Sequence, residues 1–183
     1  MNQIKGLNFL VVLLGILLCA CDAQAQKFSD LDKSPMDMVY YREGGRQGEV
    51  VARVLYSRPQ MKGREVFGKL VKYGKVWRTG ANEATEITFF QDVKFGGKEV
   101  KAGSYSLYTI PNEDKWTVIL NSDLHVWGAY SYKEENDVVR VEAPVTNDGK
   151  SLEAFSITFN KDGDATDLVL GWDTLRVAVP ITK

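Results

Sequence analysis

The residues best suited to bind a ligand lie in one segment that is rich in basic side chains. Between Ser57 and Gly80 there are seven Lys and Arg residues and one acidic residue, in a chain of 183 residues with a formal net charge of −1. Such an excess of positive charge attracts anions. Arginine reads carboxylate and phosphate groups well because its planar guanidinium makes paired hydrogen bonds. We predict that Arg58 and Arg64 bind an anionic group; the alternative is a solvated basic loop, balanced by acids in the C-terminal half.

Residues 77–83 within this segment have the composition of a binding loop. Their small members, Gly80 and Ala81, would let the backbone approach a ligand. Arg78, Asn82 and Glu83 offer donors and acceptors at close spacing, so we predict that these three contact the ligand, and we include Trp77 among the ligand-binding residues. In the alternative, Arg78 pairs with Glu83, Asn82 holds a turn and Trp77 fills the core.

A second candidate segment contains two aromatic residues, Trp127 and Tyr130, separated by Gly and Ala. Exposed aromatic rings of this kind stack on sugar rings, whose faces are apolar and whose hydroxyls are peripheral. The alternative is that both rings anchor the protein core. The only histidine, His125, precedes this segment; histidine is a common acid–base catalyst, but His125 has no recognisable partner motif.

The composition argues against several classes of function. One histidine and no cysteine beyond Cys21 make a tetrahedral zinc site untenable, and we expect no metal and no cofactor. The near-neutral charge gives no reason to expect nucleic-acid binding. The sequence has no nucleophile elbow, no phosphate-binding loop and no dinucleotide-binding glycine motif.

These observations favour a non-catalytic binding module for a small polar or anionic ligand, such as a glycan, a peptide or an envelope polymer. A second hypothesis is an extracytoplasmic hydrolase or lyase in which Glu83 is the acid or base and Arg78 stabilises negative charge. A third is a structural or assembly protein whose partner is another protein.

The N-terminal residues have the pattern of an export signal. Lys5 precedes an apolar run from Leu7 to Leu18, which is too short to span a bilayer comfortably. Two processing sites compete within residues 1–25: cleavage before Cys21, whose thiol would receive a lipid, or cleavage after Ala25. We therefore expect a protein of the periplasm or outer envelope, either released or attached to the membrane only through an N-terminal lipid anchor.

The remaining sequence predicts an all-β fold, either an antiparallel sandwich or a jelly-roll-like barrel of roughly nine or ten strands. A polar lead covers residues 26–37, and residues 38–183 form one domain whose strand-like runs alternate apolar and polar residues. The glycine pair Gly96-Gly97 predicts a tight hairpin, and a second hairpin turns at residues 111–114. Only residues 66–73 could form one short helix.

Several long motifs recur in a known family. They are Tyr73-Gly74-Lys75-Val76-Trp77-Arg78-Thr79-Gly80-Ala81-Asn82-Glu83, Ala102-Gly103-Ser104-Tyr105-Ser106-Leu107-Tyr108-Thr109-Ile110-Pro111 and Trp127-Gly128-Ala129-Tyr130. Together they resemble the domain-of-unknown-function family 2911, whose members are mostly exported or envelope-attached bacterial proteins. The similarity runs from about Ser34 to Ile181. The resemblance implies a location and a domain extent, and it implies no particular reaction.

Overall fold

The structure is a computed structural model that describes residues 26–163 and 165–183. The chain divides into two compact units, Met1–Leu31 and Asp32–Lys183. The described part of the first unit, residues 26–31, is exposed and contains no strand. The predicted signal peptide, with Cys21 and Ala25, lies outside the described residues. No helix in the described part of the chain is long and apolar enough to cross a membrane.

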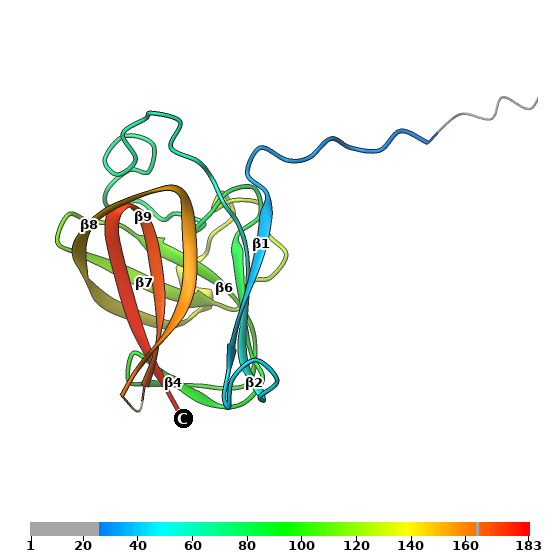
Figure 1. The fold of residues 1–183 in the computed structure, drawn as a ribbon, viewed down its shortest axis with the longest axis vertical. Coiled ribbons are helices and arrows are strands. Elements are labelled where there is room, and N and C mark those ends of the chain that lie inside the picture. Colours follow the sequence, from blue (N-terminus) through cyan, green and yellow to red (C-terminus); the bar gives the residue numbers. More distant parts are fainter. Residues whose placement is uncertain (1–25, 164) are drawn as a thin grey trace, which may run out of the picture. The chain divides into compact units, whose positions relative to one another are not determined.

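The second unit is an antiparallel β domain (Figure 1). In the described residues nine strands form one sheet in the order β1-β2-β3-β6-β7-β8-β9-β4-β5, and this sheet is not closed into a barrel. The strands are β1 (Met36–Arg42), β2 (Val50–Ser57), β3 (Thr85–Phe89), β4 (Val93–Phe95), β5 (Lys98–Val100), β6 (Gly103–Ile110), β7 (Lys115–Asn121), β8 (Asp137–Asp162) and β9 (Ala165–Thr182).

The long strand β8 divides the sheet into two layers that enclose one core. Residues 137–144 of β8 pair with β7, whereas residues 145–162 pair with β9. Alternate residues of each strand therefore point into the space between the layers. The largest of these buried side chains are Trp116 and Trp172, which are 1% exposed. With no disulfide available to the described domain, this core must supply its stability.

The structure confirms the all-β class and both predicted hairpins. Gly96 and Gly97, with φ values of 56° and 80°, connect β4 to β5, and β6 pairs with β7 as expected. Residues 66–73, the one segment where a short helix was considered possible, form turns and isolated bridges, and Val66 and Phe67 are buried. The described residues contain one 3-10 turn instead, at Glu134–Asn136 (η1).

The strand boundaries differ from the prediction in two places. The domain's first strand begins at Met36, two residues before the expected start at Met38. In the second half, the runs 138–145, 152–159, 168–172 and 175–181 each have the pattern of a separate strand. The first two belong to one long strand, β8, and the last two to another, β9, because bulges let each strand bend without breaking.

The loop of residues 122–136 covers one face of the layer that contains β6 and β7. Tyr132 packs on Tyr108 with ring centroids 5.1 Å apart and donates a hydrogen bond of 2.6 Å to Asp137. The Asn121 amide donates to Asp137 as well, at 2.8 Å, and the Asn136 amide donates to Asp123 at 2.9 Å. This polar network holds the loop on the sheet and so positions residues 125–130.

Candidate functional site

Two segments that the sequence analysis singled out separately are joined in the structure. We call residues 76–84 and 125–130 the paired loops. The Ala84 N–H donates to the Val126 carbonyl, and the Gly128 N–H donates to the Asn82 carbonyl, each at 3.0 Å. The first loop is in turn fixed to β6, because Trp77 and Thr109 exchange both main-chain hydrogen bonds.

The pairing places an acidic residue next to an exposed aromatic ring. Glu83 lies opposite Trp127 in an antiparallel bridge. Directly opposite residues project to the same side of such a pair, so the Glu83 carboxylate and the Trp127 indole are neighbours. Glu83 is exposed, and Trp127 is 59% exposed. This side of the paired loops therefore offers a hydrogen-bond acceptor beside a flat apolar surface.

The paired loops also form a shallow hollow of about 220 Å³. Its walls come from both loops: Val76, Trp77, Arg78, Ala129 and Tyr130. The Tyr130 ring is 84% exposed, which leaves its face open to a ligand. An aromatic ring, a guanidinium group and small residues thus surround one space, as expected for a site that holds a polar ring.

Gly128 explains how Arg78 and Tyr130 come so close together. A Cβ atom at Gly128 would lie 2.7 Å from Tyr130 Cε2 and 3.0 Å from Arg78 Nη1. The residue has φ of +69°, a conformation that favours glycine. The glycine between Trp127 and Ala129 is therefore required by the contact between the two loops, a role that its place in the sequence did not reveal.

Strained backbone is concentrated in the paired loops. Thr79, Asn82 and His125 have φ values of 55°, 60° and 58°. For a β-branched residue such as Thr79 this conformation is an outlier. Thr79 is fully buried, its hydroxyl lies 3.1 Å from that of Thr109, and its carbonyl accepts from Thr85 at 2.6 Å. Such strain persists where the surroundings enforce it and is common at binding sites.

The three polar residues predicted to contact a ligand have different environments. Arg78 donates one hydrogen bond, of 3.2 Å, to the Asn82 carbonyl, and no Arg78–Glu83 ion pair is found in the described part of the chain. The pKa of Asp32 is lowered by the Ser34 backbone N–H and then by the Asn82 side chain. The Asn82 amide is therefore partly engaged, whereas Glu83 is exposed and Arg78 is half-buried.

Trp77 has the packing role that the sequence analysis raised as its alternative. It stacks on Trp172 with ring centroids 5.9 Å apart and meets Phe155 edge-on at 5.0 Å. Its indole N–H donates to the Gly80 carbonyl at 3.1 Å. Trp77 also lines the hollow, but these contacts show that it anchors the first loop to the core.

The structure does not bring Arg58 and Arg64 to the paired loops. Arg58 donates to the Phe155 carbonyl at 3.1 Å, to Ser156 at 2.8 Å and to Asp37 at 2.9 Å. Arg64 donates to two carbonyls of its own loop, at 2.7 and 2.8 Å. Both guanidinium groups are therefore used within the fold.

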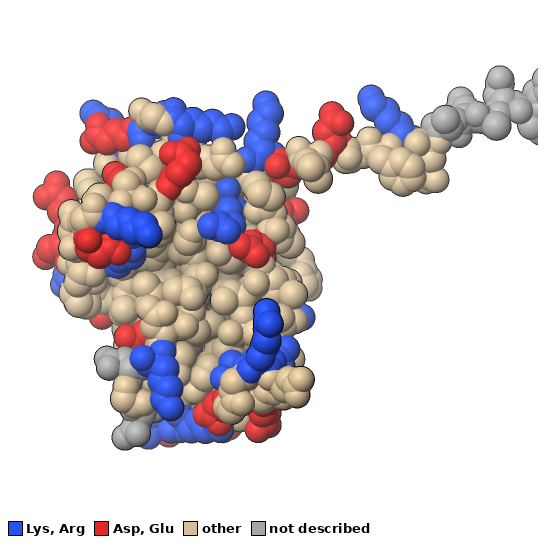
Figure 2. Space-filling model, in the orientation of Figure 1, with Lys and Arg blue, Asp and Glu red and all other residues tan. Residues whose placement is uncertain are grey.

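The basic segment does not form a uniformly positive surface. Its lysines are exposed, yet Lys62 lies against Glu153, whose carboxylate accepts the Lys62 backbone N–H at 2.8 Å. Figure 2 shows Lys, Arg, Asp and Glu side chains intermixed at the end of the domain where the loop after β2 lies. The balancing acids that the alternative interpretation invoked are thus close by.

A histidine–carboxylate contact next to the paired loops was not predicted. His125 Nδ1 lies 3.7 Å from a carboxylate oxygen of Glu86, and the two side chains are 82% and 20% exposed. The contact could not be predicted, because it depends on the folding of the loop that contains His125 onto β3, where Glu86 lies. In the described residues no group of three or more His, Cys, Asp and Glu side chains could hold a metal ion.

Comparison with known proteins shows the family of this chain. Residues 34–181 match the family described as a protein of unknown function, DUF2911. The chain belongs to the DUF2911 family. The match covers the described β domain except for two residues at each end and includes both paired loops of this DUF2911 protein. No curated protein and no solved structure matches it.

Proposed function

We propose that the protein is an exported, envelope-associated module that binds a small anionic sugar-type ligand on the paired loops. The observation that carries the proposal is a hollow in which exposed Tyr130 lies beside Arg78, on two loops tied by backbone hydrogen bonds that also present the exposed Trp127. A sugar ring would stack on an aromatic face, and its carboxylate would pair with the free part of the Arg78 fork. The Glu83 carboxylate would accept a sugar hydroxyl.

The location outside the cytoplasm rests on the sequence of the first 25 residues. In either processing mode, whether a lipid at Cys21 or release after Ala25, the domain would meet the polymers of the cell envelope. Uronic-acid glycans and acidic peptidoglycan fragments combine the ring and the carboxylate that the paired loops are suited to hold.

Fluorescence titration with glucuronic-acid and glucose oligosaccharides tests the proposal. Because Trp127 is exposed, we expect the acidic sugar to change the emission, and Trp127→Ala and Arg78→Ala each to weaken binding by about tenfold, or about 1.4 kcal/mol. Arg64→Ala is the matched control, since it removes a guanidinium far from the hollow, and should bind as the wild type does.

The same titration separates binding from catalysis. Glu83→Gln should retain binding, with some loss of affinity, and no variant should release product. An enzyme would release product, and Glu83→Gln would abolish that release while leaving binding nearly unchanged. Equal affinities for wild type, Trp127→Ala and Arg78→Ala, or no response to either sugar, would refute the proposal.

A further inference from the structure

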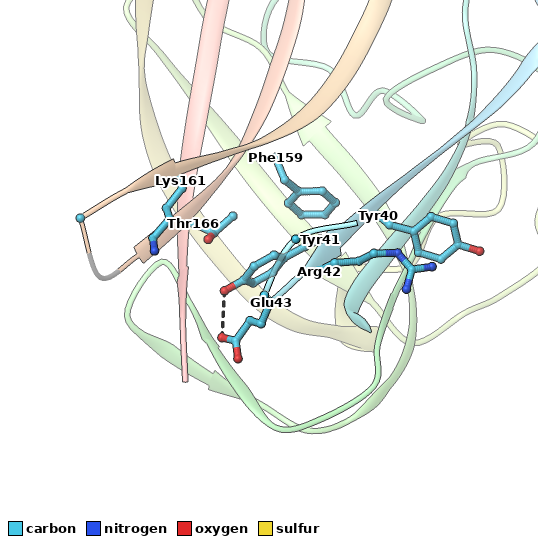
Figure 3. Close-up of a pocket in the computed structure, with 10 residues that line it drawn as sticks. Tyr40, Tyr41, Arg42, Glu43, Phe159, Lys161 and Thr166 are labelled. Carbon is cyan, nitrogen blue, oxygen red and sulfur yellow. Dashed lines mark hydrogen bonds between the residues drawn. The ribbon is translucent and has the colours of Figure 1, made fainter. Parts of the chain in front are cut away.

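A second hollow lies between the end of β1 and the hairpin formed by β8 and β9. It has a volume of about 650 Å³, within the usual range of ligand sites. One wall is the end of β1 and the following turn, with Tyr40, Tyr41 and Arg42, and the other is β8 and β9, with Phe159 and Thr166. Figure 3 shows Tyr41 and Phe159 between these walls, with Lys161 and Thr166 on the β8–β9 side.

The unpaired edge of β8 is covered by other groups only up to Ile157. The Phe155 N–H donates to the Pro59 carbonyl at 2.9 Å, and the Phe155 carbonyl accepts from Arg58 at 3.1 Å. The hydroxyl of Tyr56 accepts from the Ile157 N–H at 3.0 Å and donates to the Ile157 carbonyl at 3.4 Å. The odd-numbered residues of β8 therefore direct their main-chain groups away from β9.

The regular pairing of β8 with β9 continues from Ser156 to Asp162. Main-chain groups alternate between the two sides of a strand, so Phe159 and Lys161 point theirs into the hollow. Within residues 26–163 and 165–183 these groups have no partner on that side. The edge of β8 is thus covered at one end and open at the other.

The edge of β1 shows the same change along its length. The Arg58 N–H donates to the Pro35 carbonyl at 3.0 Å, so odd-numbered residues of β1 face β2 and even-numbered ones face outward. The outward N–H of Met38 is taken by the Asp37 carboxylate at 2.8 Å. Tyr40 is the next outward residue, and in the described structure no group covers its main chain.

We propose that this hollow binds an extended segment of a partner protein, which pairs with β8 at Phe159 and Lys161 and faces Tyr40. Two open strand edges present alternating donors and acceptors, and an extended polypeptide is the ligand that matches them. The rings of Tyr41 and Phe159, 5.8 Å apart, form an apolar floor for one of its side chains. Recognition through the main chain makes the site tolerant of the peptide's sequence.

The test uses the full chain and a short capped peptide of alternating threonine and valine, followed by NMR of the protein amides. We expect the Phe159 and Lys161 amide signals to shift on titration and their hydrogen exchange to slow at least tenfold. The same peptide with alternate residues N-methylated lacks donors on one edge. It should shift the Phe159 and Lys161 amide signals at least tenfold less.

Protein variants give a second measurement. Lys161→Pro removes the N–H that points into the hollow and keeps the bonds to β9, because proline is tolerated at a free strand edge. It should lose peptide binding, whereas Lys161→Ala, which keeps the N–H, should retain it. No amide shift at millimolar peptide, or an equal response to the N-methylated peptide, would overturn the proposal, even if Lys161→Pro failed to fold.

Discussion

Residues of the same type have opposite roles on the paired loops and in the β domain that supports them. Trp127 and Tyr130 are exposed, and within the described residues Arg78 donates one hydrogen bond, to the Asn82 carbonyl. Their counterparts Trp77, Tyr132 and Arg58 are packed or hydrogen-bonded within the domain, although Tyr132 is only two residues from Tyr130. Residue type alone therefore does not separate a binding group from a structural one; its partners do.

The two tryptophans should give the largest contrast. Trp77→Ala removes a ring packed between Trp172 and Phe155, and we expect it to lower the free energy of unfolding by about 3–5 kcal/mol. Trp127→Ala should change it by less than about 0.5 kcal/mol, because its ring is largely exposed. Urea denaturation measures both. Equal losses in the two variants would contradict the distinction between an exposed binding residue and a packed structural one.

The arginines should differ by a smaller amount. Arg58→Ala removes the side-chain donor to the Phe155 carbonyl and the ion pair with Asp37, so we expect a loss of about 1.5–3 kcal/mol in unfolding free energy. Arg78→Ala removes one long hydrogen bond and should cost about 0.5 kcal/mol. The same denaturation measurement applies. An Arg78→Ala variant as unstable as Arg58→Ala would show that Arg78 is also a structural residue.

The smallest effect concerns Tyr132 and its dependence on pH. Burial, followed by the hydrogen bond to Asp137, raises the pKa of Tyr132 above its ordinary value of 10.0. A group whose pKa is raised on folding stabilises the protein below its unfolded pKa, and this contribution is lost as the pH rises above about 10. Tyr132→Phe should therefore be less stable than wild type at about pH 8 by about 1 kcal/mol.

The comparison is completed by repeating the denaturation at about pH 11, where wild type should have lost part of its advantage over Tyr132→Phe. Tyr130→Phe is the matched control, because its ring is exposed and it should follow wild type at both values. A difference between wild type and Tyr132→Phe that does not change with pH would contradict the account.

Much of the domain could be predicted because its signals are local. The alternation of residues 104–110 and the Gly96-Gly97 pair specify strands and a hairpin through backbone preferences that do not depend on the rest of the chain. The two candidate segments could also be chosen, since glycine, aromatic and charged residues at close spacing are unusual in plain strands. The bends of β8 and β9 could not, because a bulge depends on the partner strand.

The sequence by itself determined the all-β class, the family and the segments that contain Arg78 and Trp127. Tertiary structure alone decided that a hydrogen bond between Asn82 and Gly128 joins these segments and that Arg58 is hydrogen-bonded within the domain. It also decided that β1 and β8 each have an open edge. The physical reason is distance: strand signals act between neighbours in sequence, whereas a site depends on contacts between residues tens of positions apart. Those contacts are set by packing around the common core.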